Sequence, residues 1–371
     1  MSSAARAGRM DRVRRGLQEA GVDALLLSLG ADLPWLTGYE AMPLERLTML
    51  VLPATGDASL VVPRLEAPRV DHDATLFALR PWAETEDPVA IVADMVQGAS
   101  HLAISDRAWS VFLLGLQSAV PSARWSRASL ITGPLRAVKD DAEVACLLAA
   151  AEAADRVAAQ LQGGEIPLVG RTEAEVSRDI SARLRAEGTA RVNFAIVGSG
   201  PNSASPHHEP GRRVIEAGDM VVCDFGGVLS VDGGPGYCSD ITRTVVAGEP
   251  TTEMLDLYAL LQSAQDAAVR AATVGTACED VDRAARALIE EGGFGENFIH
   301  RTGHGIGLEE HEDPYLVAGN SDPLRAGHAF SVEPGIYLAG RFGARLEDIV
   351  VATEDGPLSL NRADHSLVAV S

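Results

Sequence analysis

Apolar and polar positions follow one another in short alternating blocks through the first third of the chain. Brief apolar runs, typical of buried strands, are separated by stretches whose apolar residues recur with helical spacing. The pattern predicts strands at 23–29, 47–53, 59–62 and 101–105, and helices at 10–21, 88–98 and 108–118. Strands that alternate with helices favour a small α/β domain. Glycine and proline within 131–135 predict a linker, so the first domain is placed at 1–134.

The remaining residues, 135–371, form longer elements and predict a second domain. Thr172 and Glu175 have the Thr-x-x-Glu spacing of a capping box, which marks the start of a helix. The pattern predicts helices at 138–163, 172–188, 251–273 and 279–291, and strands at 192–198, 219–227, 236–246, 328–338 and 343–353. A loop rich in glycine and proline, 198–211, follows the first of these strands, and the next two strands can pair as a hairpin. We therefore expect an α/β fold in the wider sense that includes α+β.

Composition and charge narrow the classes of function. A chain of 371 residues is long enough for two domains. Lysine and arginine number 31 against 52 aspartates and glutamates, a net charge of −21, which argues against nucleic acid or an anionic membrane as partner. No apolar run is long enough to span a bilayer, and no secretory signal precedes the first helix. The four cysteines form no CxxC pair. We expect a reduced, cytoplasmic protein.

Polar residues of the first domain form no recognisable constellation. Trp35, Tyr39 and Trp82 are expected to be core or interface aromatics rather than ligand contacts. No glycine-rich phosphate loop follows the strands of this domain. Candidate chemistry is therefore confined to the second domain.

Acidic residues recur inside the apolar strands of the second domain, together with one histidine between glycines. The acids are Asp224, Asp240, Glu333 and Glu347, and the histidine is His304. Taken singly, an aspartate after a strand is ordinarily a turn residue, and a histidine between glycines ordinarily lies in a loop. Buried carboxylates are costly unless paired or bound to metal, so five such coincidences favour a metal site. The glycines that flank the histidine would leave room for metal and substrate.

Four carboxylates and one imidazole make an oxygen-rich set of donors. This composition suits divalent Mn²⁺, Co²⁺, Fe²⁺ or Zn²⁺. One cation would leave the set with excess negative charge, whereas two cations about 3.5 Å apart, bridged by carboxylates, would balance it. Such a pair lowers the pKa of water and polarises a carbonyl, so the predicted chemistry is hydrolysis.

Five short motifs together resemble the pita-bread metallopeptidases, the group of methionine aminopeptidase, aminopeptidase P and prolidase, with creatinase as a relative that lacks metal. The motifs are Asp224-Phe225-Gly226-Gly227, Ser239-Asp240-Ile241-Thr242-Arg243-Thr244, Gly303-His304-Gly305-Ile306-Gly307 with His311-Glu312-Asp313-Pro314, Val332-Glu333-Pro334-Gly335-Ile336-Tyr337, and Arg345-Leu346-Glu347-Asp348. The resemblance is strong over 140–371. It is weaker towards the N-terminus, where 35–39 and the stretch 135–143 are similar to the aminopeptidase P and prolidase branch. The resemblance implies a small N-terminal α/β domain followed by a pita-bread catalytic domain.

The resemblance also implies roles for the acidic residues. All five residues of the set, Asp224, Asp240, His304, Glu333 and Glu347, would hold two divalent cations, of which Mn²⁺ is the first choice. Asp240 and Glu347 would bridge the two ions. Glu333 would in addition handle the proton of the attacking water.

Five histidines have expected roles outside the metal set. By the resemblance, His207 would lie near the substrate carbonyl, and His311 would contact the substrate or the tetrahedral intermediate. His208 is expected to have a surface or secondary role. His300 is either an accessory histidine behind the site or a core residue, and His328 is expected to be structural.

Two further residues would support the ligands. Arg345 is expected to orient Glu347 through a charge-assisted hydrogen bond, and Thr242 to support the ligands from behind. The chain departs from the family pattern in 229–235, which lengthens the hairpin loop. Because the flanking motifs survive, Asp224 is preferred over Asp232 as the ligand.

The resemblance leaves several functions open. The first is release of the N-terminal residue from Xaa-Pro peptides, as in aminopeptidase P. The alternatives are a prolidase restricted to Xaa-Pro dipeptides, a creatinase- or lyase-like enzyme on a non-peptide substrate, and a non-catalytic peptide-binding module. Retention of all five ligand residues argues against the last two. The expected partners are a proline-containing peptide and a second copy of the chain in a homodimer.

Overall fold

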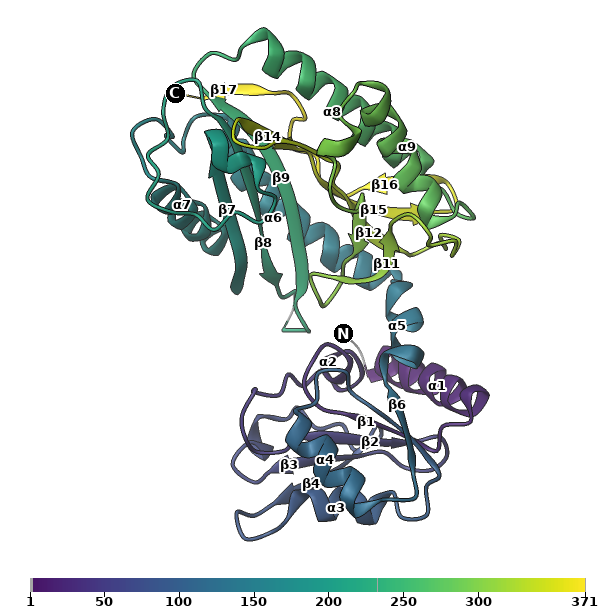
Figure 1. The fold of residues 1–371 in the computed structure, drawn as a ribbon. Coiled ribbons are helices and arrows are strands. Elements are labelled where there is room, and N and C mark those ends of the chain that lie inside the picture. The colour runs from purple at the N-terminus through teal and green to yellow at the C-terminus, as the bar shows by residue number, and fades with distance from the viewer. Residues whose placement is uncertain (1–2, 232, 371) are drawn as a thin grey trace. The chain divides into compact units, whose positions relative to one another are not determined.

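The computed structural model describes residues 3–231 and 233–370, which form two compact units that meet in sequence between Arg136 and Ala137 (Figure 1). Each unit has its own sheets and its own apolar core. The mixed α/β class expected from the sequence is confirmed. No helix among the described residues combines the length and the apolar character needed to cross a bilayer.

The first unit is built on one six-stranded sheet with the order β4-β3-β2-β1-β5-β6. Its strands are β1 (Ala24–Leu27), β2 (Met49–Pro53), β3 (Ser59–Pro63), β4 (Ala78–Trp82), β5 (His101–Ile104) and β6 (Arg124–Arg127), and its helices are α1 (Ser3–Ala20), α2 (Asp32–Thr37), α3 (Pro88–Met95), α4 (Ser110–Ala119) and a 3-10 turn, η1 (Ala67–Arg69). All four predicted strands and all three predicted helices are present, whereas α2, β4 and β6 were not predicted. Trp35, Tyr39 and Trp82 are buried, as expected of core aromatics.

The predicted linker at 131–135 lies inside a helix that ends at the boundary between the two units. Helix α5 (Ser129–Ala137) runs through Pro134. Side chains of the helix are tied to a distant buried acid: Thr132 donates a hydrogen bond to Asp32, and Arg136 forms an ion pair with it at 2.9 Å. These contacts span about 100 residues of sequence, so the local glycine and proline gave no sign of them.

The second unit has a four-stranded sheet in the order β17-β9-β8-β7. Its strands are β7 (Arg191–Ser199), β8 (Met220–Leu229), β9 (Tyr237–Ala247) and β17 (Val368–Val370), and the 3-10 turn η2 (Gly200–Ala204) follows β7. Strands β8 and β9 form the long-looped hairpin that the sequence predicts. Helices α6 (Asp141–Gln162) and α7 (Glu173–Ala186) pack on this sheet through a continuous apolar core, and Figure 1 shows α7 alongside β7. Both helices begin with a capping box, the one at Thr172 having been predicted.

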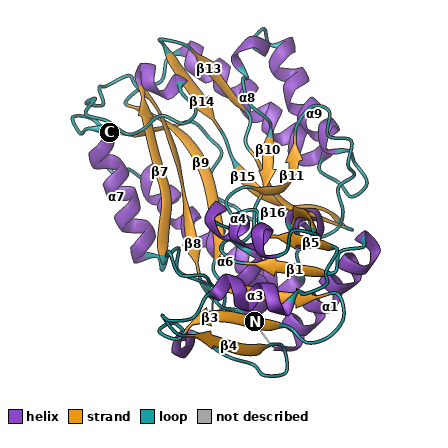
Figure 2. Ribbon diagram, turned by 60° about the horizontal axis from the view of Figure 1, so that its bottom comes forward, coloured by secondary structure: helices purple, strands orange, loops and turns teal. Residues whose placement is uncertain are grey.

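A second layer of the same unit contains a five-stranded sheet, a two-stranded sheet and two helices. The strands are β10 (Gly303–Gly305), β11 (Glu312–Leu316), β12 (Ala329–Val332), β15 (Asp348–Thr353) and β16 (Gly356–Ser359) in one sheet, and β13 (Gly335–Leu338) and β14 (Phe342–Arg345) in the other. Helices α8 (Thr252–Ala271) and α9 (Cys278–Glu291), next to each other in Figure 2, pack on them, and the 3-10 turn η3 (Gly295–Asn297) follows α9.

Two predicted strands are each broken into two, and the breaks lie at acidic residues. The predicted strand 328–338 divides at Glu333-Pro334, and the predicted strand 343–353 divides at Leu346-Glu347. Before the first break the chain pairs with β15, and after it with β14. Pro334 has no N–H to continue the ladder. The change of partner places Glu333 and Glu347 between the regular strands.

Candidate metal centre

Asp224 and Asp240 are brought together by the register of the β8–β9 hairpin. Asp224 lies opposite Thr242, and Asp240 lies opposite Gly226. Because Thr242 follows Asp240 by two residues, the two aspartates are diagonal neighbours on one face of the sheet. A Cβ atom at Gly226 would come within 2.1 Å of the Ser239 carbonyl oxygen. Glycine at this position therefore allows β9 to approach closely beside Asp240.

His304 lies in the middle of β10, between two neighbouring strands. A Cβ atom at Gly303 would lie 1.9 Å from the Ser331 carbonyl oxygen, and one at Gly305 would lie 2.1 Å from the Asp313 carbonyl oxygen. The flanking glycines are therefore needed for close approach of the adjacent backbone. The sequence suggested that these glycines leave room for metal and substrate. The structure shows a different reason for them, the close approach of the neighbouring backbone.

The imidazole of His304 points its Nε2 atom at carboxylates. Nε2 lies 3.2 Å from Oε1 of Glu333 and 3.8 Å from Oδ2 of Asp240. The other ring nitrogen, Nδ1, lies 3.2 Å from the Gly305 carbonyl oxygen, to which it can only donate. In the neutral ring this leaves a lone pair on Nε2 that faces the acids. A cation between them would satisfy all three groups.

Buried carboxylates of the cluster lack enough compensating positive charge. Asp240, His304 and Glu347 each offer one ligand atom, all within 4.8 Å of one another, and all three residues are buried. Burial and mutual repulsion raise the pKa of Asp240 and of Glu347 well above the ordinary values. Burial likewise raises the pKa of Asp224, although the charge of Arg345 opposes the shift. Such a set favours a bound cation.

Two oxygens of the cluster have no hydrogen-bond partner. They are Oδ1 of Asp224 and Oδ1 of Asp240, both buried. Buried polar atoms ordinarily have a hydrogen-bond partner. Two unpartnered oxygens on neighbouring acids therefore indicate that these oxygens bind a group that is not part of the chain. Oxygen and imidazole donors suit divalent transition cations. The residues present therefore fit a divalent metal site.

Glu333 differs from the other acids of the cluster. Burial acts to raise its pKa, but when the ring of His304 carries protons on both nitrogens, its hydrogen bond and charge outweigh burial and lower the pKa of Glu333 to about 2. Ser331 also donates a hydrogen bond to Glu333 at 3.1 Å, and the same hydroxyl accepts one from the backbone of His304. Glu333 is thus held as a carboxylate beside the histidine.

Arg345 supports Asp224, and the expectation that it binds Glu347 directly is wrong. Its guanidinium pairs with Asp224 and donates to the hydroxyl of Thr242 at 3.0 Å. That hydroxyl in turn donates to Glu347 at 2.6 Å. Arg345 therefore reaches Glu347 through Thr242, which β9 places between them. The supporting position predicted for Thr242 is where the structure puts it.

His300 makes both a polar contact behind the site and a packing contact with the core, the two roles that the sequence left open. Its Nε2 lies 2.9 Å from the hydroxyl of Tyr337, and its ring meets Phe298 edge to face. Tyr337 also accepts a hydrogen bond from Arg345 at 2.9 Å. The sequence reasoning quoted Tyr337 in a motif but missed that it links His300 to Arg345.

His311 lies beside His304, with their ring centroids 4.0 Å apart. Partial burial lowers the pKa of His311 to about 4, and the charge of His304 adds to this effect. The next residue, Glu312, forms a buried ion pair with Lys139 at 2.6 Å. This contact was not predicted, because Lys139 and Glu312 lie 173 positions apart in sequence.

His207 and His208 occupy the loop after η2. His207 is exposed, and the carbonyl oxygen of the preceding Pro206 accepts a hydrogen bond from Arg345 at 3.2 Å. Since Arg345 also binds Asp224, this contact places His207 next to the cluster. His208 turns the other way and binds the buried Glu173, a residue for which the sequence predicted no role. The rejected ligand, Asp232, lies outside the described residues.

Arg243 and Asp348 form a fully buried ion pair behind Glu347. Their closest atoms are 2.8 Å apart. Arg243 also donates to the backbone carbonyl of Glu347 at 2.7 Å, and His365 binds the other oxygen of Asp348. The pair thus fixes the backbone of Glu347 from the side opposite Thr242. Both residues stand in quoted motifs, but their partners lie about 100 positions away.

Comparisons with known proteins agree with the geometry. Residues 145–354 match the model of metallopeptidase family M24, and residues 9–138 match the creatinase/prolidase N-terminal domain. The chain is 45% identical to a probable dipeptidase PepE of Mycobacterium tuberculosis, over 95% of this chain and 93% of that one. It is 34% identical to a Xaa-Pro dipeptidase of Lactobacillus delbrueckii subsp. lactis, over 94% of this chain and 95% of that one.

Among solved structures, the dipeptidase PepE of Mycobacterium ulcerans superposes with a TM-score of 0.92 at 44% identity, covering 100% of this chain and 99% of that one. The fold, the acidic cluster and the sequence matches thus lead to one conclusion. The chain belongs to metallopeptidase family M24 and carries a creatinase/prolidase-type N-terminal domain.

Proposed function

We propose that the protein hydrolyses the peptide bond before proline in Xaa-Pro dipeptides, using two divalent cations. The cations would be held by Asp224, Asp240, His304, Glu333 and Glu347. The observation that carries this proposal is the pair of orphaned, buried oxygens on Asp224 and Asp240. Two divalent cations in such a site lower the pKa of water and polarise a peptide carbonyl.

The chain's own residues would supply orientation and proton transfer. Glu333, whose carboxylate lies 3.2 Å from Nε2 of His304 within the cluster, would accept a proton from water at a carboxylate oxygen. The exposed imidazoles of His207 and His311 would hydrogen-bond the substrate carbonyl as negative charge develops on its oxygen. Proline removes the N–H that general peptidases hold, so a dedicated site is needed.

The preference for dipeptides rests on the relatives. The sequence analysis preferred the aminopeptidase P-like reaction on longer peptides. Two relatives that cover nearly the whole chain are instead named dipeptidases, one of them Xaa-Pro dipeptidase. We therefore place Xaa-Pro dipeptides first and Xaa-Pro-Yaa peptides second.

A paired assay decides between the two reactions. Purified protein with Mn²⁺ is given a Xaa-Pro dipeptide, the Xaa-Pro-Yaa tripeptide with the same first residue, and a Xaa-Ala dipeptide as control. The proposal expects turnover of the first peptide only. Efficient cleavage of the tripeptide would restore the aminopeptidase assignment, and equal cleavage of the control would remove the requirement for proline.

Further parts of the proposal concern metal, assembly and location. We propose Mn²⁺ as the first choice of metal, with Co²⁺, Zn²⁺ or Fe²⁺ as alternatives, and a cytoplasmic homodimer with domains at 1–134 and 135–371. Elemental analysis of protein purified without added metal identifies the bound ion. Light scattering coupled to gel filtration gives the mass of the assembly, and a monomer active at assay concentration would remove the dimer.

A further inference from the structure

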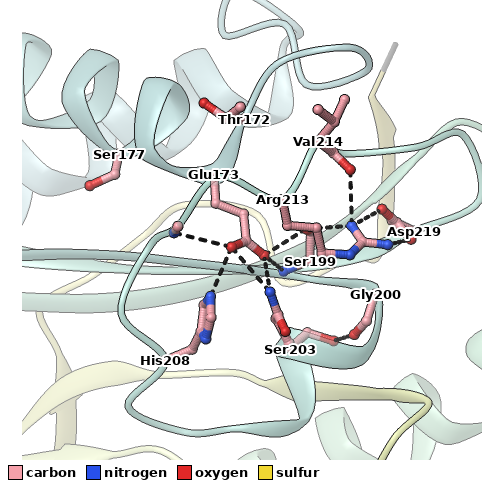
Figure 3. A network of polar contacts seen from close by, with 12 residues as sticks. Thr172, Glu173, Ser177, Ser199, Gly200, Ser203, His208, Arg213, Val214 and Asp219 are labelled. Carbon is pink, nitrogen blue, oxygen red and sulfur yellow. Dashed lines mark hydrogen bonds and ion pairs between the residues drawn. The ribbon is translucent and has the colours of Figure 1, made fainter.

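Glu173 is a fully buried carboxylate that takes no part in the metal cluster. It is the first residue of α7, and its side chain has no exposed surface. Figure 3 shows the carboxylate surrounded by donors from the end of β7 and the following loop. They are the backbone N–H of Ser199 at 2.9 Å, the hydroxyl of Ser199 at 2.7 Å, the amide of Asn202 at 3.0 Å, Nε2 of His208 at 2.8 Å and the backbone N–H of Gly211 at 3.3 Å.

The carboxylate closes the loop 200–211 onto a rigid helix. Ser199 and Gly211 lie at the two ends of this loop, and His208 lies within it. The backbone of α7 also holds the C-terminal end of the loop, because Ala174 N–H donates to the Gly211 carbonyl and Glu173 N–H donates to the Arg213 carbonyl. A helix N-terminus also favours negative charge. Burial acts to raise the pKa of Glu173, but the hydrogen bonds from His208 and Ser199 outweigh it and the pKa is lowered.

The loop is held from its other side by the residue that binds Asp224. Arg345 donates to the carbonyl of Pro206, and the hydroxyl of Ser203 accepts from the backbone of Gly343. His207 therefore stands between two anchored neighbours, Pro206 and His208. Within the described part of the chain, His207 itself makes no hydrogen bond. Its position is set by its neighbours alone.

We propose that Glu173 is a positioning residue for catalysis: by binding His208 and both ends of the loop, it holds His207 where it can reach the substrate carbonyl. This inference rests on the role given to His207 in the proposed function. His208, one position further on, then supports the loop through its bond to Glu173 and is not merely a surface residue. A misplacement of about 1 Å at such a group can cost roughly 100-fold in rate.

The test is a double-mutant cycle in the metal-loaded, full-length protein. Glu173→Gln keeps the shape of the side chain but removes the charge and places an amide against donors. We expect kcat on a Xaa-Pro dipeptide to fall by roughly 100-fold with little change in KM, and the bound metal to stay at the wild-type amount. In a His207→Ala background the same change should cost less than about threefold, because the group that it positions is gone.

Glu209→Gln is the matched control, since it removes one exposed charge from the same loop and leaves the Glu173 network intact. It should retain wild-type kcat. Should Glu173→Gln not fold, His208→Ala enters the same cycle with the same expectation. Equal losses from Glu173→Gln with and without His207 would show a general structural role and overturn the inference, as would wild-type kcat in both Glu173→Gln and His208→Ala.

A readout independent of turnover separates this inference from the proposed function. Hydrogen exchange in peptides covering 200–211 should be faster in Glu173→Gln than in wild type or Glu209→Gln, and unchanged in peptides covering β10. Faster exchange in this loop, in a protein that cleaves no Xaa-Pro bond, would refute the proposed function and leave the anchoring intact. Unchanged exchange would overturn the anchoring itself.

Discussion

Two groups of buried acids in the second unit differ in how their charge is satisfied. Glu173 accepts hydrogen bonds from five donor groups, and its pKa is lowered. Asp224, Asp240 and Glu347 belong to a buried cluster in which their pKa values are raised, and two of their oxygens have no hydrogen-bond partner. Burial is common to both groups, so burial alone does not identify a ligand site. The acids of the metal centre differ from Glu173 because too few hydrogen-bond donors and too little positive charge surround them.

The largest effect should follow from removing one unsatisfied acid. Asp240→Asn takes away a negative charge that repels its neighbours, so the metal-free variant should unfold at the same or a higher temperature than metal-free wild type, with a gain on the order of 1 kcal/mol. Turnover and bound metal should both be lost, because Asp240 is one of the proposed metal ligands. Calorimetry of the stripped proteins and elemental analysis measure the two results. A strongly destabilised apo variant would mean that Asp240 is a structural acid like Glu173.

Removal of metal should also distinguish the acids of the metal centre from Glu173. A ligand that binds only the folded state at 100 times its Kd stabilises by about 2.7 kcal/mol. Chelation should therefore lower the melting temperature of wild type, and the shift should vanish in Asp240→Asn but persist in Glu173→Gln. A chelation shift of equal size in Asp240→Asn would place the metal elsewhere.

Glu173→Gln should be destabilising, in contrast to Asp240→Asn. The variant leaves several buried donors facing an amide, which costs about 1–3 kcal/mol per unsatisfied group. Denaturant unfolding of the apo proteins gives the change, with Glu209→Gln as the control near zero. An apo stability equal to that of wild type would show that the donors find other partners, and the comparison between the two acid groups would fail.

Thr242→Val should have an effect confined to the metal centre. The hydroxyl accepts from Arg345 and donates to Glu347, and valine keeps its shape. Loss of such an outer contact typically lowers metal affinity by about 10- to 100-fold. Titration with Mn²⁺ checks this value, and Thr242→Ser should restore most of the affinity. Wild-type affinity in Thr242→Val would mean that Glu347 needs no support from β9.

The smallest expected effect is in the pH dependence of stability. The pKa of Glu173 is lower in the folded protein than its ordinary value, so its contribution is present above the unfolded pKa and lost as pH falls through the folded pKa. His208 and Arg213 are the basic side chains that face its network. Between roughly pH 3 and 5, unfolding free energy should rise less steeply in Glu173→Gln than in wild type. Equal slopes would show that the hydrogen bonds to Glu173 do not lower its pKa in the folded protein.

Much of the fold could be predicted from local pattern. Strand 219–227, the hairpin with 236–246 and the capping box at Thr172 were all indicated by residues a few positions apart. The acids that cluster in the structure were likewise indicated, because each stands in an apolar strand where an isolated charge is costly. Local signals sufficed for these features since the periodicity and the cost of burial are both visible in short windows.

The supporting contacts could not be predicted, because they join distant parts of the chain. Arg136 meets Asp32 and turns the expected linker into a helix, Lys139 meets Glu312, and the breaks at Glu333 and Glu347 come from a change of strand partner. None of these has a local signature beyond a proline or a charge. The direct contact expected between Arg345 and Glu347 failed for a related reason. Strand alternation predicts which side chains share a face, and not which of them meets across strands.

The central claim is that the unsatisfied acids bind two divalent cations that the proposed reaction requires. The direct measurement is a Mn²⁺ titration of thoroughly stripped protein, in which bound metal and cleavage of a Xaa-Pro dipeptide are followed in the same samples. The account predicts that bound metal saturates at two ions per chain, with turnover appearing in step, and that neither occurs in Asp240→Asn. Full turnover by the stripped wild-type protein in the presence of chelator would contradict it.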